Sequence, residues 1–128
     1  MQRLGLVTLV VRDYDEAIAF YVEVLGFALR EDTSLPHGAR WVVVCAGPDD
    51  PTGLLLARAT SAEQLDRVGD QTGGRVGFFL NSDDFATDHA RLVAAGVHFL
   101  EEPRYEAYGS VPVFKDLYGN RWDLVELD

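Results

Sequence analysis

Residues 6–13 read Leu6-Val7-Thr8-Leu9-Val10-Val11-Arg12-Asp13, and residues 76–83 read Val76-Gly77-Phe78-Phe79-Leu80-Asn81-Ser82-Asp83. Each stretch is an apolar, strand-like segment that ends in an aspartate. A helical pattern follows each one and stops at a glycine, 13 residues after Asp13 at Gly26 and 13 residues after Asp83 at Gly96. An offset of 70 residues between the copies indicates a duplicated supersecondary unit.

The rest of the chain extends this unit in the same way in both halves. Carboxylates suit a helix N-terminus, and glycine suits the position after a helix end. Further strands follow each helix, which gives the order βαβββ twice and an α+β fold. We expect strands at 4–11, 27–33, 40–45, 54–57, 76–81, 97–101, 111–114 and 121–127, and helices at 14–25, 61–68 and 84–95. The chain is then one domain over residues 1–128, with module one at 1–70 and module two at 71–128. Each module supplies an open half-sheet, and together they form a cupped mixed β-sheet.

Composition restricts the classes of function. The chain has 128 residues, a formal net charge of −10 and a single lysine, Lys115. An acidic chain without a basic run is a poor ligand for nucleic acid or for an anionic membrane, because phosphate contacts supply most of that affinity. The single cysteine, Cys45, excludes an internal disulfide and a cysteine-rich zinc site, and a buried, unreactive thiol is expected there. The beginning of the chain lacks the pattern of a signal peptide, so we expect a cytoplasmic protein.

Three motifs point to a known family. They are Val11-Arg12-Asp13 with Leu25-Gly26-Phe27, then Ala94-Ala95-Gly96-Val97, and then Asp116-Leu117-Tyr118-Gly119-Asn120-Arg121-Trp122-Asp123-Leu124. Together with the duplication they resemble the vicinal oxygen chelate superfamily, which includes glyoxalase I, bleomycin-resistance proteins and extradiol dioxygenases. The resemblance spans essentially the whole chain and implies the glyoxalase/bleomycin-resistance/dioxygenase fold. It leaves the function open, because that fold carries isomerases, lyases, dioxygenases, epimerases and binding proteins.

The resemblance also places the metal ligands of metal-using relatives. Those four positions, usually His or Glu, correspond here to Leu6, to one residue of Leu54–Leu56, to one residue of Arg75–Gly77, and to Asp123. One carboxylate cannot hold a hard divalent ion, and a guanidinium beside it would repel a cation. We therefore predict no metal ligands and no cofactor.

Strand alternation and the resemblance together select the residues that face the cavity. Asp123 is the candidate general base, although a structural carboxylate paired with Arg75 or Arg121 is the alternative we favour. We expect Arg75 and Asp123 to face one another, and Arg75 is alternatively a contact for an anionic ligand group or for a second subunit. The ligand-binding candidates are Leu6, Thr8, Trp41, Leu56, Arg75, Phe79, Tyr108 and Arg121.

Two functions follow from this set. The first is a small-molecule-binding protein of the glyoxalase/bleomycin-resistance type, which takes an apolar or aromatic ligand into the cavity without a metal. The second is a lyase or isomerase of the glyoxalase-like class, either metal-free with Asp123 as base or metal-dependent through displaced ligands. The resemblance further implies a homodimer, and for Trp41 and Tyr108 a dimer interface is an equally good reading. Asp116 with Gly119-Asn120 is expected to be a turn device.

Overall fold

The computed structural model describes residues 1–100, 105–106, 109–110 and 112–126. The chain divides into two compact units, Met1–Val68 and Gly69–Asp128. The division falls two residues before the expected module boundary, at the start of the glycine-rich stretch that follows Val68.

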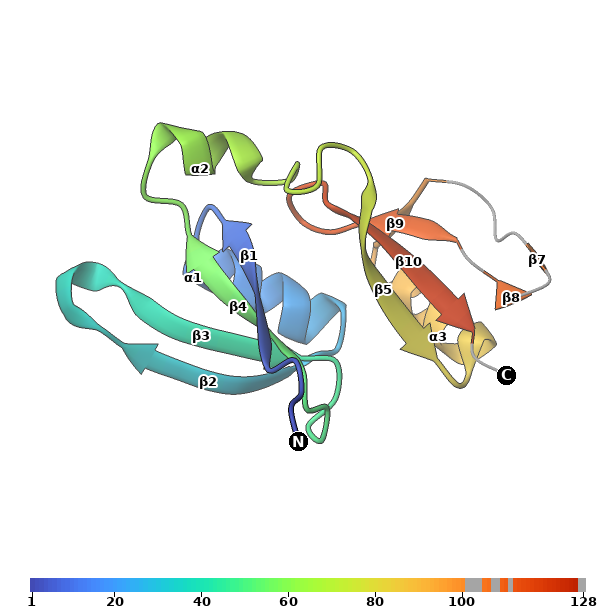
Figure 1. The fold of residues 1–128 in the computed structure, drawn as a ribbon. Coiled ribbons are helices and arrows are strands. Elements are labelled where there is room, and N and C mark those ends of the chain that lie inside the picture. The colour runs from blue at the N-terminus through green and yellow to red at the C-terminus, as the bar shows by residue number, and fades with distance from the viewer. Residues whose placement is uncertain (101–104, 107–108, 111, 127–128) are drawn as a thin grey trace. The chain divides into compact units, whose positions relative to one another are not determined.

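The first unit is a four-stranded mixed sheet with one long helix against it (Figure 1). The strand order is β1-β4-β3-β2, with β1 parallel to β4 and the other pairs antiparallel. Its elements are β1 (Leu6–Val11), α1 (Tyr14–Ile18), the π-helical segment η1 (Ala19–Val24), β2 (Ala28–Ser34), the 3-10 turn η2 (Pro36–Gly38), β3 (Arg40–Cys45), β4 (Gly53–Arg58) and α2 (Ala62–Arg67).

The second unit repeats this topology. Its four-stranded sheet has the order β5-β10-β9-β6, again with the first two strands parallel. A separate two-stranded ladder joins β7 to β8. The elements are β5 (Val76–Ser82), α3 (Phe85–Ala94), β6 (His98–Phe99), β7 (Tyr105–Glu106), β8 (Gly109–Ser110), β9 (Val113–Lys115) and β10 (Arg121–Glu126). The equivalence of the two strand orders confirms the duplicated α+β fold.

The two helices begin and end by the devices that the sequence indicated. The Asp13 carboxylate accepts a hydrogen bond from the backbone N–H of Glu16, and in the second unit Asp84 is the capping residue. The capping aspartates are therefore offset by 71 residues, whereas the stop glycines Gly26 and Gly96 remain offset by 70 and share a positive φ. The first helix holds one residue more than the second, and its π-helical turn accommodates that residue within the same span.

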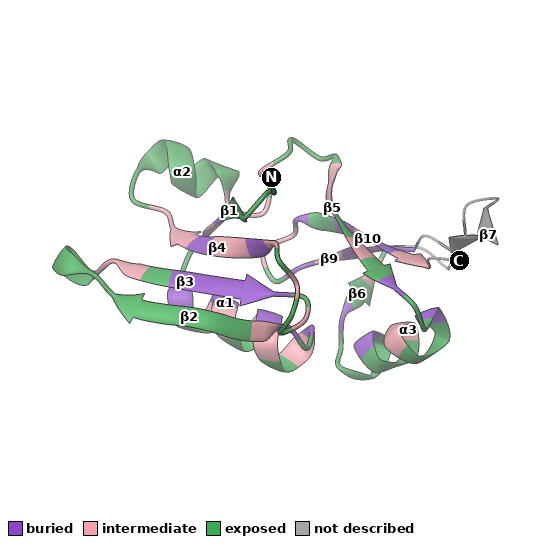
Figure 2. Ribbon diagram, turned by 60° about the horizontal axis from the view of Figure 1, so that its bottom comes forward, coloured by how far each residue is buried: buried purple, intermediate pink, exposed green. Residues whose placement is uncertain are grey.

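Figure 2 shows that β3 is largely buried and β2 largely exposed. Strand alternation then separates the core face of β1 from its opposite face. In β1, Leu9 and Val11 are fully buried, and they lie on the side of the helix residues Ala17 and Tyr21, which are also fully buried. Leu6 and Thr8 point the other way and are exposed. Full burial of a leucine or valine side chain, such as those of Leu9 and Val11, stabilises the fold by roughly 1.5–3 kcal/mol.

A continuous row of aromatic rings defines the core face of the second unit. Neighbouring ring centroids lie 4.6 to 5.9 Å apart along Phe78, Trp122, Phe114, Phe99, His89 and Phe85. The row crosses the sheet from β5 through β10, β9 and β6 and ends on α3. Because Trp122 is buried in this row, its chain neighbours Arg121 and Asp123 must lie on the opposite face of the sheet.

Candidate functional site

Unit 1 carries its share of the predicted site on the sheet face opposite α1. Leu6 is 39% exposed and Trp41 is 38% exposed, and Thr8 is exposed between flanking apolar positions. A Cβ placed on Gly53 would come within 2.9 Å of Val43, 3.0 Å of the Cys45 sulfur and 3.3 Å of Leu6. These side chains therefore converge over the backbone of Gly53, where Val43 and Cys45 are buried and Leu6 stays partly exposed.

The assignment of Leu56 to this face is wrong. Leu56 is fully buried and lies beside Leu9 in the parallel register, so it belongs to the core between sheet and helix. Leu55 is its counterpart on the opposite face, where it lies beside Thr8 and is half-buried. A displacement of one residue along a strand moves a side chain to the other face.

Unit 2 carries Phe79 and Asp123 on the face opposite its aromatic row. The two residues are direct neighbours in the parallel register of β5 and β10. Phe79 is 63% exposed, whereas the Oδ1 atom of Asp123 is buried. The face thus combines an exposed ring with a partly desolvated carboxylate.

The expected ion pair between Arg75 and Asp123 is absent from the residues that the structure describes. The register gives the reason, because Asp123 lies beside Phe79, four residues beyond Arg75 on the neighbouring strand. At about 3.3 Å per residue, the two positions are separated by roughly 13 Å along the strand direction. Arg75 instead joins a different group of charges.

That group surrounds a cavity of about 200 Å³ within unit 2. The cavity is lined by Gly69, Asp70, Thr72, Gly74, Arg75, Lys115, Gly119, Asn120 and Arg121. Three lining side chains are cationic and one is anionic. The sequence predicted binding roles for Arg75 and Arg121 but not for Lys115 or for the loop at 69–74. The glycine-rich composition of that loop was the available signal.

The loop is fixed to the turn that follows β9. The Asp116 carboxylate accepts hydrogen bonds from the backbone N–H groups of Tyr118, Gly119 and Asn120 and from the side chains of Asn120 and Trp122. The Asn120 side-chain oxygen then accepts the backbone N–H of Gln71 at 3.3 Å. The expected turn device is confirmed, and it also anchors one wall of the cavity.

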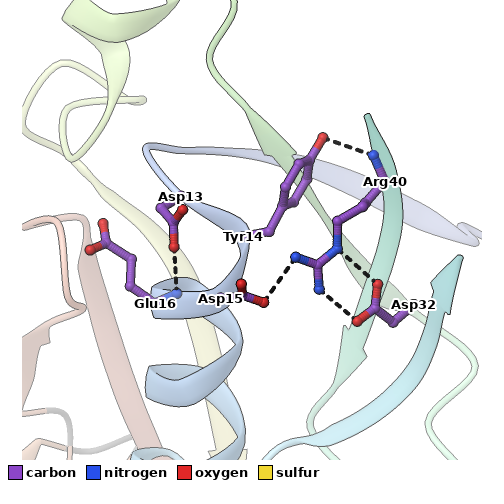
Figure 3. A network of polar contacts seen from close by, with 6 residues as sticks. All are labelled: Asp13, Tyr14, Asp15, Glu16, Asp32 and Arg40. Atoms are coloured by element: carbon purple, nitrogen blue, oxygen red, sulfur yellow. Dashed lines mark hydrogen bonds and ion pairs between the residues drawn. The ribbon is translucent and has the colours of Figure 1, made fainter. Parts of the chain in front are cut away.

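A second polar cluster lies in unit 1, between the β2–β3 hairpin and α1 (Figure 3). The Arg40 guanidinium donates to both carboxylate oxygens of Asp32, at 3.1 and 2.7 Å, and to Asp15 at 2.8 Å. Its carbon lies 5.2 Å from the centre of the Tyr14 ring, and the Arg58 guanidinium lies equally close to that ring. The Arg40 hydrogen bonds lower the pKa of Asp32 and raise that of Arg40. This cluster joins the β2–β3 hairpin to α1, and we interpret it as structural.

Cys45 and Tyr108 are two further residues for which the sequence made a prediction. Cys45 is buried, and desolvation raises the pKa of its thiol, as expected for an unreactive cysteine. Tyr108 lies outside the described residues. The remaining site residues stay predictions: Leu6, Thr8, Trp41, Arg75, Phe79, Arg121 and Asp123.

The donor set does not fit the metal of metal-using relatives. The positions that the resemblance assigns to ligands hold leucines, an arginine–valine–glycine segment and Asp123. Within the described ranges, no three His, Cys, Asp or Glu side chains come together in a way that could hold an ion. Among the same residues, no helix has the length and apolar character needed to cross a bilayer.

The sequence model of the Glyoxalase/Bleomycin resistance protein/Dioxygenase superfamily matches residues 3–124. The chain belongs to this superfamily. An uncharacterized protein of Shewanella frigidimarina (strain NCIMB 400) is 51% identical over 128 residues, which are 99% of this chain and 95% of that protein. The superfamily is thus shown by sequence along nearly the whole chain.

Solved structures of the superfamily's fold agree. UcmS2 matches with a TM-score of 0.84 and 29% identity, covering 98% of both chains. TnmS3, an antibiotic binding protein from Streptomyces sp. CB03234, matches with a TM-score of 0.80 and 30% identity, covering 100% of this chain and 98% of that chain. The solved structures that resemble this chain therefore include an antibiotic binding protein.

Proposed function

We propose that this protein binds an apolar or aromatic small molecule on the helix-free faces of its sheets, without the metal used by other members of the superfamily. The observation that carries the proposal is the exposure of Leu6, Trp41 and Phe79 on those faces. Leu6 occupies a position where a metal-using relative would carry a ligand. Hydrophobic side chains at such positions favour an apolar ligand over an ion.

The energy available from these side chains is substantial. The Phe79 side chain is 63% exposed, and a phenylalanine side chain can bury about 200 Å². Covering that exposed part with an apolar ligand would contribute roughly 3 kcal/mol at about 25 cal/mol per Å². Leu6 and Trp41 would each contribute a smaller amount where a ligand covers them. The likeness to TnmS3, which binds an antibiotic, supports the same type of function.

The test uses the neutral aromatic dye N-phenyl-1-naphthylamine in a buffer with EDTA. We expect saturable binding, detected by dye fluorescence and by a rise in melting temperature. Leu6→Asp and Phe79→Asp should each weaken binding, because a buried carboxylate on an apolar face is unfavourable. Matched controls are Leu65→Asp on α2 and Val93→Asp on α3, which are also exposed apolar positions and should leave binding unchanged.

Two results would refute the proposal. One is dye binding that all four variants weaken equally or not at all. The other is stoichiometric zinc, nickel, iron or manganese in the purified protein, measured by mass spectrometry, together with loss of binding in EDTA.

A metal-free lyase or isomerase is the second candidate, and the position of Asp123 favours it. Its Oδ1 is buried on the same face as the exposed Phe79 ring, and a partly desolvated carboxylate beside an apolar surface suits a general base. For a catalytic base, Asp123→Asn should abolish turnover of any substrate found and leave its binding intact. For a structural carboxylate, the same variant should lower the melting temperature and reduce binding and turnover together.

The subunit arrangement and cellular location are part of the proposal. We propose a homodimer acting in the cytoplasm, for which the support is the superfamily resemblance and the single buried cysteine. Light scattering coupled to size-exclusion chromatography should give about twice the 14.2 kDa chain mass. A mass of one chain at micromolar concentration would contradict the dimer.

A further inference from the structure

The cavity in unit 2 collects positive charge in a chain that is otherwise strongly acidic. Arg75, Lys115 and Arg121 line it, against the single carboxylate of Asp70, while the chain as a whole has a net charge of −10. Among the described residues, none of the three cations takes part in an ion pair. We propose that this cavity binds a small oxyanion, namely a phosphate, a sulfate or the carboxylate or sulfonate group of a larger ligand.

The register of the sheet places two of these cations close together, and their repulsion destabilises the folded sheet. Arg121 and Lys115 are directly opposite one another on β10 and β9, on the same face. Like charges in directly opposed positions destabilise an antiparallel pair. An anion bound between them would convert this repulsion into two favourable contacts. This arrangement is therefore more easily explained by a ligand than by the stability of the empty sheet.

The nearest acidic residue in sequence does not line the cavity. Asp116 follows Lys115 directly, but its carboxylate accepts the N–H groups of the following turn, and the residue is 5% exposed. Asp70 is the acidic residue among those that line the cavity.

The opposite wall is held in place before any ligand arrives. Gly69 has a φ of +80°, and a Cβ there would lie 1.9 Å from the carbonyl oxygen of Tyr118. A Cβ on Gly77 would lie 2.7 Å from the methyl carbon of Thr72, whose hydroxyl donates to the carbonyl of Arg75. The loop therefore packs on both the turn and β5 through glycines, and little order has to be gained on binding.

Size and chemistry agree with an oxyanion. A volume of about 200 Å³ is smaller than the roughly 300–1,000 Å³ of pockets that enclose a drug-sized ligand. It suits one tetrahedral or planar anionic group with some water. Guanidinium groups bind such groups through paired N–H donors, and the ammonium of Lys115 adds a mobile charge.

The first arm of the test is a titration with inorganic phosphate at fixed ionic strength, in which calorimetry measures the binding affinity. Arg75→Gln, Lys115→Gln and Arg121→Gln should each weaken phosphate binding by roughly ten-fold, the effect of losing one charge-assisted hydrogen bond. Asp70→Asn should strengthen it. The matched control Arg3→Gln removes an exposed arginine of unit 1 and should leave the affinity unchanged.

Thermal unfolding separates a binding role from a structural one. Lys115→Gln should raise the melting temperature without phosphate, because it relieves the repulsion with Arg121, and should reduce the rise that phosphate produces. A structural role for Lys115 would instead lower the melting temperature of the ligand-free protein. Circular dichroism of each variant verifies that it is folded.

The second arm identifies the source of the anion. It compares 1-anilinonaphthalene-8-sulfonate, which carries a sulfonate, with neutral N-phenyl-1-naphthylamine. If the cavity takes an anionic substituent of a larger ligand, Arg121→Gln weakens the sulfonate dye and leaves the neutral dye unaffected. If it takes a free anion, only phosphate binding changes. The proposal is overturned if the three cavity variants affect neither anion, or if Arg3→Gln has the same effect. Because the neutral dye alone reports on the apolar faces, failure of the proposed function is recognised separately.

Discussion

Removing the carboxylate of Asp116 is expected to be one of the most damaging single changes in unit 2. Asp116 is 5% exposed, and its two oxygens accept hydrogen bonds from three backbone N–H groups, at 2.9 to 3.0 Å, and from two side chains. Asp116→Ala leaves all of these donors without that acceptor. The segment from residue 117 to 122 would lose the shared acceptor that holds its donors in place.

The magnitude follows from which donors water can reach. Hydrogen bonds to a charged group stabilise by roughly 1.5–3 kcal/mol each, but the partly exposed N–H groups of Tyr118 and Gly119 regain water in the variant. The buried groups of Asn120 and Trp122 do not, so we expect a loss of about 3–5 kcal/mol in the free energy of unfolding. Asp116→Asn retains one oxygen but turns an NH2 group toward donors of Asn120 and Trp122, and should lose about half as much.

Urea unfolding followed by tryptophan fluorescence measures these losses, because Trp122 reports on this region directly. With a slope of about 2 kcal/mol per molar urea, Asp116→Ala should shift the midpoint by about 2 M. Asp83→Ala is the matched control, since Asp83 is exposed and its carboxylate is not the helix cap. If Asp116→Ala and Asp83→Ala have midpoints within about 0.3 M of each other, the turn does not depend on this carboxylate and the reasoning is refuted.

Three further outcomes test other parts of the structure. Arg40→Gln should destabilise the protein by about 1–2 kcal/mol at neutral pH. Because the pKa of Asp32 is held below its ordinary value of 3.8, the free energies of unfolding of wild type and variant, measured in urea, should converge as pH falls below that value. A difference that stays constant down to pH ~2 would contradict the pairing of Arg40 with Asp32. Gly69→Ala should lower the melting temperature far more than Gly73→Ala, since both glycines have positive φ but only Gly69 meets a carbonyl; equal effects would show that the close approach is unimportant. Cys45 should react with Ellman's reagent at pH 8 much more slowly in the native protein than in urea, and comparable rates would contradict its burial.

The strand and helix order could be predicted from sequence because it depends on local signals. Apolar alternation and the two stop glycines gave both βαβββ units, and the Asp13 cap was placed correctly. The sequence left open which of Asp83 and Asp84 caps the second helix, because both are good capping residues. The helix register decides this, and Asp84 is the cap.

The faces of the strands were predicted where alternation is strict and missed where it is not. Phe79 and Asp123 share the face expected from alternation in β5 and β10. In Leu54-Leu55-Leu56 three identical side chains carry no alternating signal, so the buried member could be chosen only from the pairing of Leu56 with Leu9.

The sequence by itself determined the duplication, the α+β class and the superfamily, because each of these is written in residue identity and spacing along the chain. Only the tertiary structure decided which charges meet. It separated Arg75 from Asp123 by four residues of strand and brought Arg75, Lys115 and Arg121 around one cavity. The physical reason is that charge–charge distances depend on strand register and loop path, which are set by packing across the whole unit and leave no local pattern in the sequence.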